Sequence, residues 1–210
     1  MSEHDSFRPW ISMWTSPRKT IATLAQGNLN RGLLWLSLIY GFSGLLNFFQ
    51  SIFFGNQLSM SPILFLAVIL APVWGYASFS AWSFVVWFTG KWIKGTASFK
   101  VVRLAYAWSC IPFVVNVILW IIMAMIFGQV LFMNFTEGYA FTQKEVGFLF
   151  FILIARIAVG IWSFIIYLNA LAEVQQFSIL RAIGNVLLGA VFMAIVFWLI
   201  SLLFFFVLNL

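Results

Sequence analysis

Charged residues are scarce in this sequence and make up only 8% of its 210 residues. Ordinary soluble domains carry about 25% charged residues, so this chain has too few to cover a globule with a hydrated surface. The sequence also contains a single cysteine, Cys110, and a single histidine, His4. These counts exclude an intramolecular disulfide, a metal site built from several cysteines, and a histidine-based catalytic dyad in the apolar part of the chain.

Motifs for catalysis and for nucleic-acid binding are missing as well. The sequence has no glycine-rich phosphate loop ending in Lys and Ser or Thr, and no pair of carboxylates inside an apolar stretch. Its net charge of +6 is spread along the chain and is not gathered into one basic arm or stripe. We therefore expect a non-enzymatic protein with no catalytic residues, no metal, no cofactor and no nucleic-acid partner.

Long hydrophobic runs dominate what is present. Hydrophobic residues make up 64% of the chain, including 26 Phe and 11 Trp, and the mean hydropathy is +1.06. About 20 apolar residues suffice to cross the roughly 30 Å hydrocarbon core of a bilayer as a helix. The sequence predicts an all-α fold, a polytopic membrane bundle with five transmembrane helices at about 32–54, 62–89, 103–128, 146–171 and 184–208. Residues 32–210 would form one membrane domain.

The N-terminal segment, residues 1–31, has its own pattern. Trp10, Met13, Trp14 and Pro17 share one helical face, and Ser16 before Pro17 resembles an N-cap followed by a first-turn proline. Aromatic residues next to basic ones favour the headgroup layer of a membrane. We expect a short amphipathic interfacial helix here, although a partner-binding segment would show the same pattern.

The cations predict the orientation of the chain in the membrane. One predicted face carries nine of them and the other carries only Lys144. Because positive loops stay in the cytoplasm, the N-terminus is expected inside and, with five spans, the C-terminus outside. This basic face would meet anionic lipid headgroups. The nine cations are Arg8, Arg18, Lys19, Arg31, Lys91, Lys94, Lys100, Arg103 and Arg181.

Arg156 is the one charge placed well inside a predicted span, roughly 15 Å deep at 1.5 Å per residue. A charge at this depth is costly, so Arg156 should face the bundle interior or a wet cavity. It shares a helical stripe with Ser163 and Tyr167, and Asn47 and Asn116 fall at similar depth on other spans. Two interpretations stay open, namely contact with an anion or lipid headgroup, and hydrogen bonding that holds the helices together.

Prolines and small residues predict the shape of the helices. Pro72 and Pro112 fall inside the second and third spans and should kink them. Ser37, Gly41 and Gly44 on the first span form a small-residue face for close helix packing, and Asn185 with Gly189 does so on the fifth.

Two stretches resemble the Yip1 domain family. One is GKWIKGTASFKVVRLAYAWSCIP (Gly90 to Pro112), and the other is YLNALAEVQQFSILRA (Tyr167 to Ala182); the early Ser16 to Ile21 segment agrees as well. Eukaryotic members are Golgi and endoplasmic-reticulum proteins linked to Rab GTPases and vesicle traffic. Their long cytosolic N-terminal region is absent here, so the chain resembles the bacterial branch, which implies a bacterial cytoplasmic membrane.

The resemblance directs attention to a cytoplasmic-face cluster, in which Glu173 is expected to pair with Lys100, Arg103 or Arg181. We predict an adaptor or membrane-organising factor that acts through this face. The alternative is a small transporter or lipid-translocating protein that uses Arg156, and a third is a subunit or chaperone of another membrane complex. Expected partners are anionic lipid and a membrane protein or a second copy of this chain. The cluster comprises Lys94, Ser98, Lys100, Arg103, Glu173, Phe177, Ser178 and Arg181.

Overall fold

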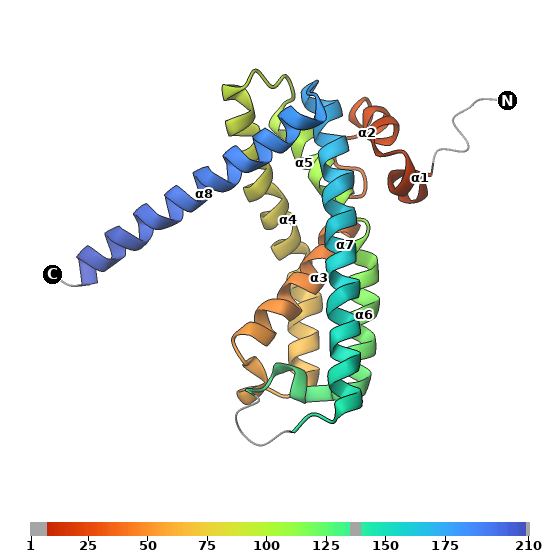
Figure 1. Ribbon diagram of the computed structural model, residues 1–210, viewed down its shortest axis with the longest axis vertical. Coiled ribbons are helices and arrows are strands. Elements are labelled where there is room, and N and C mark those ends of the chain that lie inside the picture. Colours follow the sequence, from red (N-terminus) through yellow and green to blue (C-terminus); the bar gives the residue numbers. More distant parts are fainter. Residues whose placement is uncertain (1–7, 135–139, 209–210) are drawn as a thin grey trace.

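The computed structural model describes residues 8–134 and 140–208, and these are helical with short connections (Figure 1). His4 and Glu137 lie outside the described residues. The α-helices are α1 (Pro9–Thr15), α2 (Pro17–Ala25), α3 (Leu33–Ser51), α4 (Met60–Trp92), α5 (Phe99–Ser109), α6 (Phe113–Phe127), α7 (Gln143–Gln175) and α8 (Ile179–Leu208). Two short 3₁₀ helices, η2 (Phe54–Asn56) and η3 (Gly128–Phe132), lie at the ends of α3 and α6.

Five helices are long and apolar enough to cross a membrane, as the hydrophobic runs predict. They are α3, α4, α6 continued by η3, α7 and α8. Helices α4 and α7 each have 33 residues and extend beyond the predicted spans at both ends. At 1.5 Å per residue each is about 50 Å long, so both project out of a hydrocarbon core of roughly 30 Å.

The predicted third span, residues 103–128, is wrong as a single helix. The chain breaks between α5 and α6, at Cys110 to Pro112, because Pro112 has no N–H to continue the α-helical ladder. The Phe113 N–H bonds instead to the Cys110 carbonyl (3.0 Å), which leaves the Ser109 carbonyl to accept from the Ser163 hydroxyl (2.8 Å). The break thus separates α5 from the membrane-spanning α6. Pro72, by contrast, lies inside α4, and the helix continues through it.

Helices α3 and α4 form a closely packed hairpin. A Cβ atom on Gly41 would collide with the Ala71 carbonyl oxygen, and one on Gly75 would collide with the Ser37 carbonyl oxygen. The backbones therefore touch through their glycines, which is how small residues promote helix association in membranes. The predicted small-residue face of the first span is confirmed at Ser37 and Gly41.

The N-terminal segment forms two helices and packs on the protein. The predicted helix start is confirmed, since Ser16 is the N-cap of α2 and Pro17 is its first residue. Met13, Ile21 and Leu24 are at most 3% exposed, because they pack in one apolar core with residues of α5 and α7. Arg18 adds a hydrogen bond from Nε to the Asn169 side chain of α7 (3.1 Å). This segment is therefore part of the folded domain and does more than lie on a headgroup layer.

The connections gather at opposite ends of the bundle (Figure 1). At one end the η2 and η3 segments meet, where the Gln129 side chain donates to the Gly55 carbonyl (2.9 Å). At the other end lie α1, α2, the loop between α4 and α5, and the start of α8 (Figure 1). The cations predicted to be cytoplasmic belong to this second end. Helix α8 leaves it obliquely, with most of its apolar side chains exposed (Figure 1).

Candidate functional site

The two segments that resemble the family motifs meet at this second end. The loop at residues 93–98 lies against the last residue of α7, Gln175, which is only 1% exposed. The Gln175 side-chain Oε1 accepts a hydrogen bond from the Ala97 N–H (3.2 Å), and its backbone carbonyl accepts one from the Thr96 hydroxyl (3.3 Å). We call Gln175, Thr96 and Ala97 the latch. The latch connects segments about 80 residues apart in the sequence. Its formation therefore depends on the tertiary fold and not on local structure.

Two glycines make room for the latch. A Cβ atom on Gly95 would collide with the Gln175 Oε1, and one on Gly90 would lie 2.7 Å from its Nε2. The Gly95 N–H also donates to the Gly90 carbonyl (2.8 Å), which turns the chain sharply after α4. Lys94 lies in this turn with a φ of 65°, a left-handed conformation that side chains other than glycine rarely adopt. The turn leaves Lys94 exposed at the surface.

A second buried polar contact joins α4 to α8. The Thr89 hydroxyl donates to Oδ1 of Asn185 (3.0 Å), and both side chains are 0% exposed. One turn further along α8, a Cβ atom on Gly189 would lie 3.4 Å from the Val85 side chain. The predicted packing face at Asn185 and Gly189 is confirmed, and it fixes where α8 leaves the bundle.

Lys94 and Arg181 both line one cavity of about 380 Å³. Lys94 comes from the turn after α4 and Arg181 from the first turns of α8, so the latch sets their separation. The other lining residues are Trp92, Ile93, Gly184 and Leu188, which carry no charge. The cavity therefore combines two positive side chains with an apolar wall, a composition suited to an anionic group on a partly apolar molecule.

Arg181 is oriented by its neighbours in the cluster. Its guanidinium carbon lies 5.6 Å from the centre of the Phe177 ring, a cation–π distance, and Phe177 is itself 6% exposed. Its backbone N–H donates to the Ser178 side chain (3.3 Å), which acts as a cap at the start of α8. Ser98 holds the corresponding N-cap position of α5, without a side-chain cap bond.

The expected ion pair of Glu173 in the cluster is wrong. Within residues 8–134 and 140–208, Glu173 forms no ion pair with Lys100, Arg103 or Arg181. Arg103 is instead buried, with 6% of its surface exposed, and donates from Nη1 to the Tyr76 hydroxyl (2.6 Å). The reason is that α5 turns back along the bundle, so its Arg103 points toward α4 and not toward the α7–α8 turn.

Arg156 lies between α7, α3 and α6, as its depth predicted. Its Nη1 donates to Oδ1 of Asn47 (3.3 Å), and its guanidinium carbon lies 4.4 Å from the centre of the Trp120 ring. Nη2 contacts the Met123 sulfur (3.4 Å). The positive charge is thus balanced by an amide oxygen, a ring face and a polarisable sulfur, and no described carboxylate reaches it.

The other polar residues predicted near Arg156 do not share its site. Ser163 bonds to the carbonyl freed by the helix break, and Tyr167 packs against Tyr106 with ring centres 5.0 Å apart. Asn116 is 9% exposed, and its Oδ1 has no hydrogen-bond partner among the described residues. The predicted set of polar residues therefore divides into separate contacts, and within it only Asn47 bonds to Arg156.

Sequence reasoning missed the residues that assemble these sites. Gln175 is one of two adjacent glutamines in a polar connection, and Tyr76 is an aromatic residue within an apolar run, so neither pattern distinguishes these residues. A usable indication was the pair Gly90 and Gly95, because glycines flanking a cationic turn suggest close backbone approach. Among the described residues, no group of three or more His, Cys, Asp or Glu side chains is placed to hold a metal ion.

A comparison with known families places the chain. The sequence model of the Yip1 domain matches residues 11–208. The chain belongs to the Yip1 domain family. The matched range includes most of α1, all of α2, both motif segments and all five membrane-spanning helices, so this Yip1 domain is an integral membrane protein. No curated protein and no solved structure matches the chain at a significant level.

Proposed function

We propose that this Yip1 domain protein is a non-enzymatic membrane-organising factor or adaptor that binds anionic headgroups through its cytoplasmic end. The observation that carries the proposal is the cavity between Lys94 and Arg181, which has two cations and no acidic side chain in its lining. The latch joins the loop that carries Lys94 to the end of α7, and Arg181 follows shortly after in the first turn of α8.

The proposed ligand is a phosphate-bearing lipid headgroup at the cytoplasmic leaflet. Lys and Arg near an anionic membrane surface contribute about 1 kcal/mol each, and this attraction weakens as salt screens it. Trp92 and Leu188 give the cavity an apolar wall that fits the glycerol and first methylenes of a lipid. Binding there would recruit anionic lipid around the protein, which is the membrane-organising activity we propose.

The test measures which lipids the protein retains. Purified protein from nanodiscs of mixed phosphatidylglycerol and phosphatidylcholine would be compared as wild type, Lys94→Gln, Arg181→Gln and Lys144→Gln. Lys144 is an exposed cation at the opposite end of the bundle and serves as the matched control. We expect Lys94→Gln and Arg181→Gln each to lower the phosphatidylglycerol enrichment about fivefold at low salt. Equal losses with all three variants, or no loss, would refute the proposal.

A transport role at Arg156 is the second candidate function. It is favoured by one observation, which is that the Arg156 Nε has no hydrogen-bond partner among the described residues and no carboxylate balances the charge. A planar guanidinium whose charge no described carboxylate balances suits a phosphate or carboxylate on a substrate. The proposal requires Arg156 to contact that group directly. Substitutions of Arg156 distinguish this transport role from a purely structural one.

A further inference from the structure

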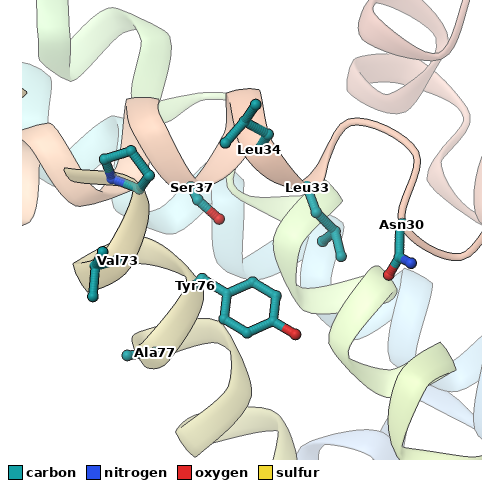
Figure 2. A pocket seen from close by; sticks show the side chains of 8 residues that line it. Asn30, Leu33, Leu34, Ser37, Val73, Tyr76 and Ala77 are labelled. Carbon is teal, nitrogen blue, oxygen red and sulfur yellow. The ribbon is translucent and has the colours of Figure 1, made fainter. Parts of the chain in front are cut away.

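An elongated groove lies between α3 and α4 on the membrane-facing side of the hairpin. Its volume is about 630 Å³, within the range of pockets that hold small molecules (Figure 2). Leu34 and Val73 form part of its wall and are 61% and 69% exposed. Because both helices are membrane spans, the surroundings of these exposed apolar side chains are lipid chains.

Polar groups are spread along this groove, with Asn30 at one end and Ser37 toward the other. Asn30, Ser37 and Tyr76 line it, and Figure 2 shows the Ser37 hydroxyl directed into the space between the helices, above the Tyr76 ring. Ser37 is 1% exposed, and its hydroxyl has no hydrogen-bond partner among the described residues. A buried hydroxyl without a partner is costly, so this position favours a ligand that supplies an acceptor.

Arg103 determines which kind of ligand fits. Its Nη1 donates to the Tyr76 hydroxyl (2.6 Å) and its Nη2 lies 3.5 Å from Oδ1 of Asn30. A guanidinium only donates, so these oxygens are used as acceptors, and the Tyr76 hydrogen and the Asn30 amide hydrogens remain for the ligand. The groove therefore offers donors from Tyr76, Asn30 and Ser37, backed by the positive charge of Arg103, which no described carboxylate neutralises.

We propose that this groove binds one anionic glycerophospholipid from the leaflet at the α5 end of the bundle. The phosphate or ester oxygens accept hydrogen bonds from Tyr76, Ser37 and Asn30, while an acyl chain lies along Leu34 and Val73. Arg103 positions Tyr76 and supplies the charge that favours an anionic headgroup over a zwitterionic one. This site is separate from the Lys94–Arg181 cavity, whose lining shares no residue with it.

The test uses short-chain lipids and native mass spectrometry of the full chain in detergent. Dioctanoyl phosphatidylglycerol should bind with a stoichiometry of one at the groove and more tightly than dioctanoyl phosphatidylcholine. Glycerophosphoglycerol, the headgroup without chains, should not compete, which distinguishes a lipid from a free phosphate. Equal affinity for the two lipids, or full competition by the soluble headgroup, would overturn the proposal.

Substitutions locate the binding. Val73→Trp fills the groove and should abolish the tight binding, whereas the matched control Val68→Trp changes a 54% exposed valine of the same helix outside the groove and should not. Tyr76→Phe removes one donor and keeps the ring, so affinity should fall about fivefold. Wild-type binding by Val73→Trp and Tyr76→Phe would overturn the proposal.

Two controls keep the outcome interpretable. Cys110 is the sole cysteine and is 2% exposed, so resistance to thiol labelling reports that each variant is folded. The double variant K94Q/R181Q should bind the groove lipid as the wild type does. Failure of the headgroup proposal at Lys94 and Arg181 is thereby distinguished from failure of the groove proposal. Loss of the groove lipid in this double variant would overturn the assignment to the groove.

Discussion

The contact between α3 and α4 predicts that Gly41→Ala destabilises the protein. The new methyl group would collide with the carbonyl oxygen of Ala71 and would lie 2.9 Å from the backbone nitrogen of Gly75. Backbone atoms cannot move aside by a rotamer change, so the two helices must separate. Overpacking of this kind costs about 1–3 kcal/mol. The better helix propensity of alanine offsets up to about 1 kcal/mol of that loss.

Gly160→Ala is the matched control, because a Cβ atom there meets nothing within 4 Å. Both substitutions gain the same helix propensity, so the difference between them isolates the packing cost of about 1–3 kcal/mol. The assay follows maleimide labelling of the buried Cys110 in purified protein during a denaturant titration. Each 1.4 kcal/mol changes the folding equilibrium constant about tenfold. Cys110 in Gly41→Ala should therefore become labelled at a clearly lower midpoint concentration of denaturant. An equal or higher midpoint than that of Gly160→Ala would refute the close contact.

Three further predictions concern the break before α6, the partly buried Arg156 and the topology. Ser163→Ala removes the donor to the Ser109 carbonyl and should cost about 1–3 kcal/mol in the same labelling assay, while Ser201→Ala on exposed α8 should be neutral. Arg156→Gln and Arg156→Lys should both impair activity in a folded protein if Arg156 contacts an anion, and Arg156→Gln should alter only stability if its contacts are structural. Reporters inserted at Thr142 and fused to the C-terminus should both lie outside the cytoplasm, and a cytoplasmic reading from either would contradict the proposed topology.

The hydrophobic runs were enough to predict the helices, because membrane-spanning length is a property of the chain itself. They could not reveal the break before α6, since the residues next to Pro112 (Cys110 and Ile111 before it, Phe113 and Val114 after it) continue the apolar run. Length-based reasoning therefore joined α5 to α6. Pro112 by itself predicts only a kink. The hydrogen bond from the Ser163 hydroxyl to the Ser109 carbonyl explains why a full break is tolerated between α5 and α6.

The candidate sites were predictable only in part, for a reason that Arg103 illustrates. Its position in the sequence predicts that Arg103 lies with the other cations at the predicted cytoplasmic end. Its depth there made it a candidate partner for Glu173. Its partner is chosen by the direction in which α5 packs, and that direction depends on contacts with α4 and α7 far away in the sequence. The orientation of Arg156 was easier to predict, because a charge inside a membrane span must face inward whatever the details of packing.

Arg103 and Arg156 are balanced in the same way, by neutral oxygens and aromatic rings. Arg103 lies 4.8 Å from the Tyr76 ring centre and Arg156 lies 4.4 Å from that of Trp120. Ring faces and amides stabilise a cation without cancelling its charge, whereas a carboxylate would cancel it. The charge that remains is therefore available to an anion from outside the chain.

The charge that remains on Arg103 predicts the effect of Asn30→Asp. The asparagine Oδ1 lies 3.5 Å from Nη2 of Arg103, so an aspartate of the same shape would form an ion pair there. Because Asn30 is exposed, the pair should add only about 0–1 kcal/mol to stability. It should nevertheless weaken phosphatidylglycerol binding in the groove more than Tyr76→Phe does, because it removes the amide donors and neutralises the charge together. Phosphatidylcholine binding should change less, and a variant that keeps its preference for phosphatidylglycerol would show that Arg103 does not select the headgroup.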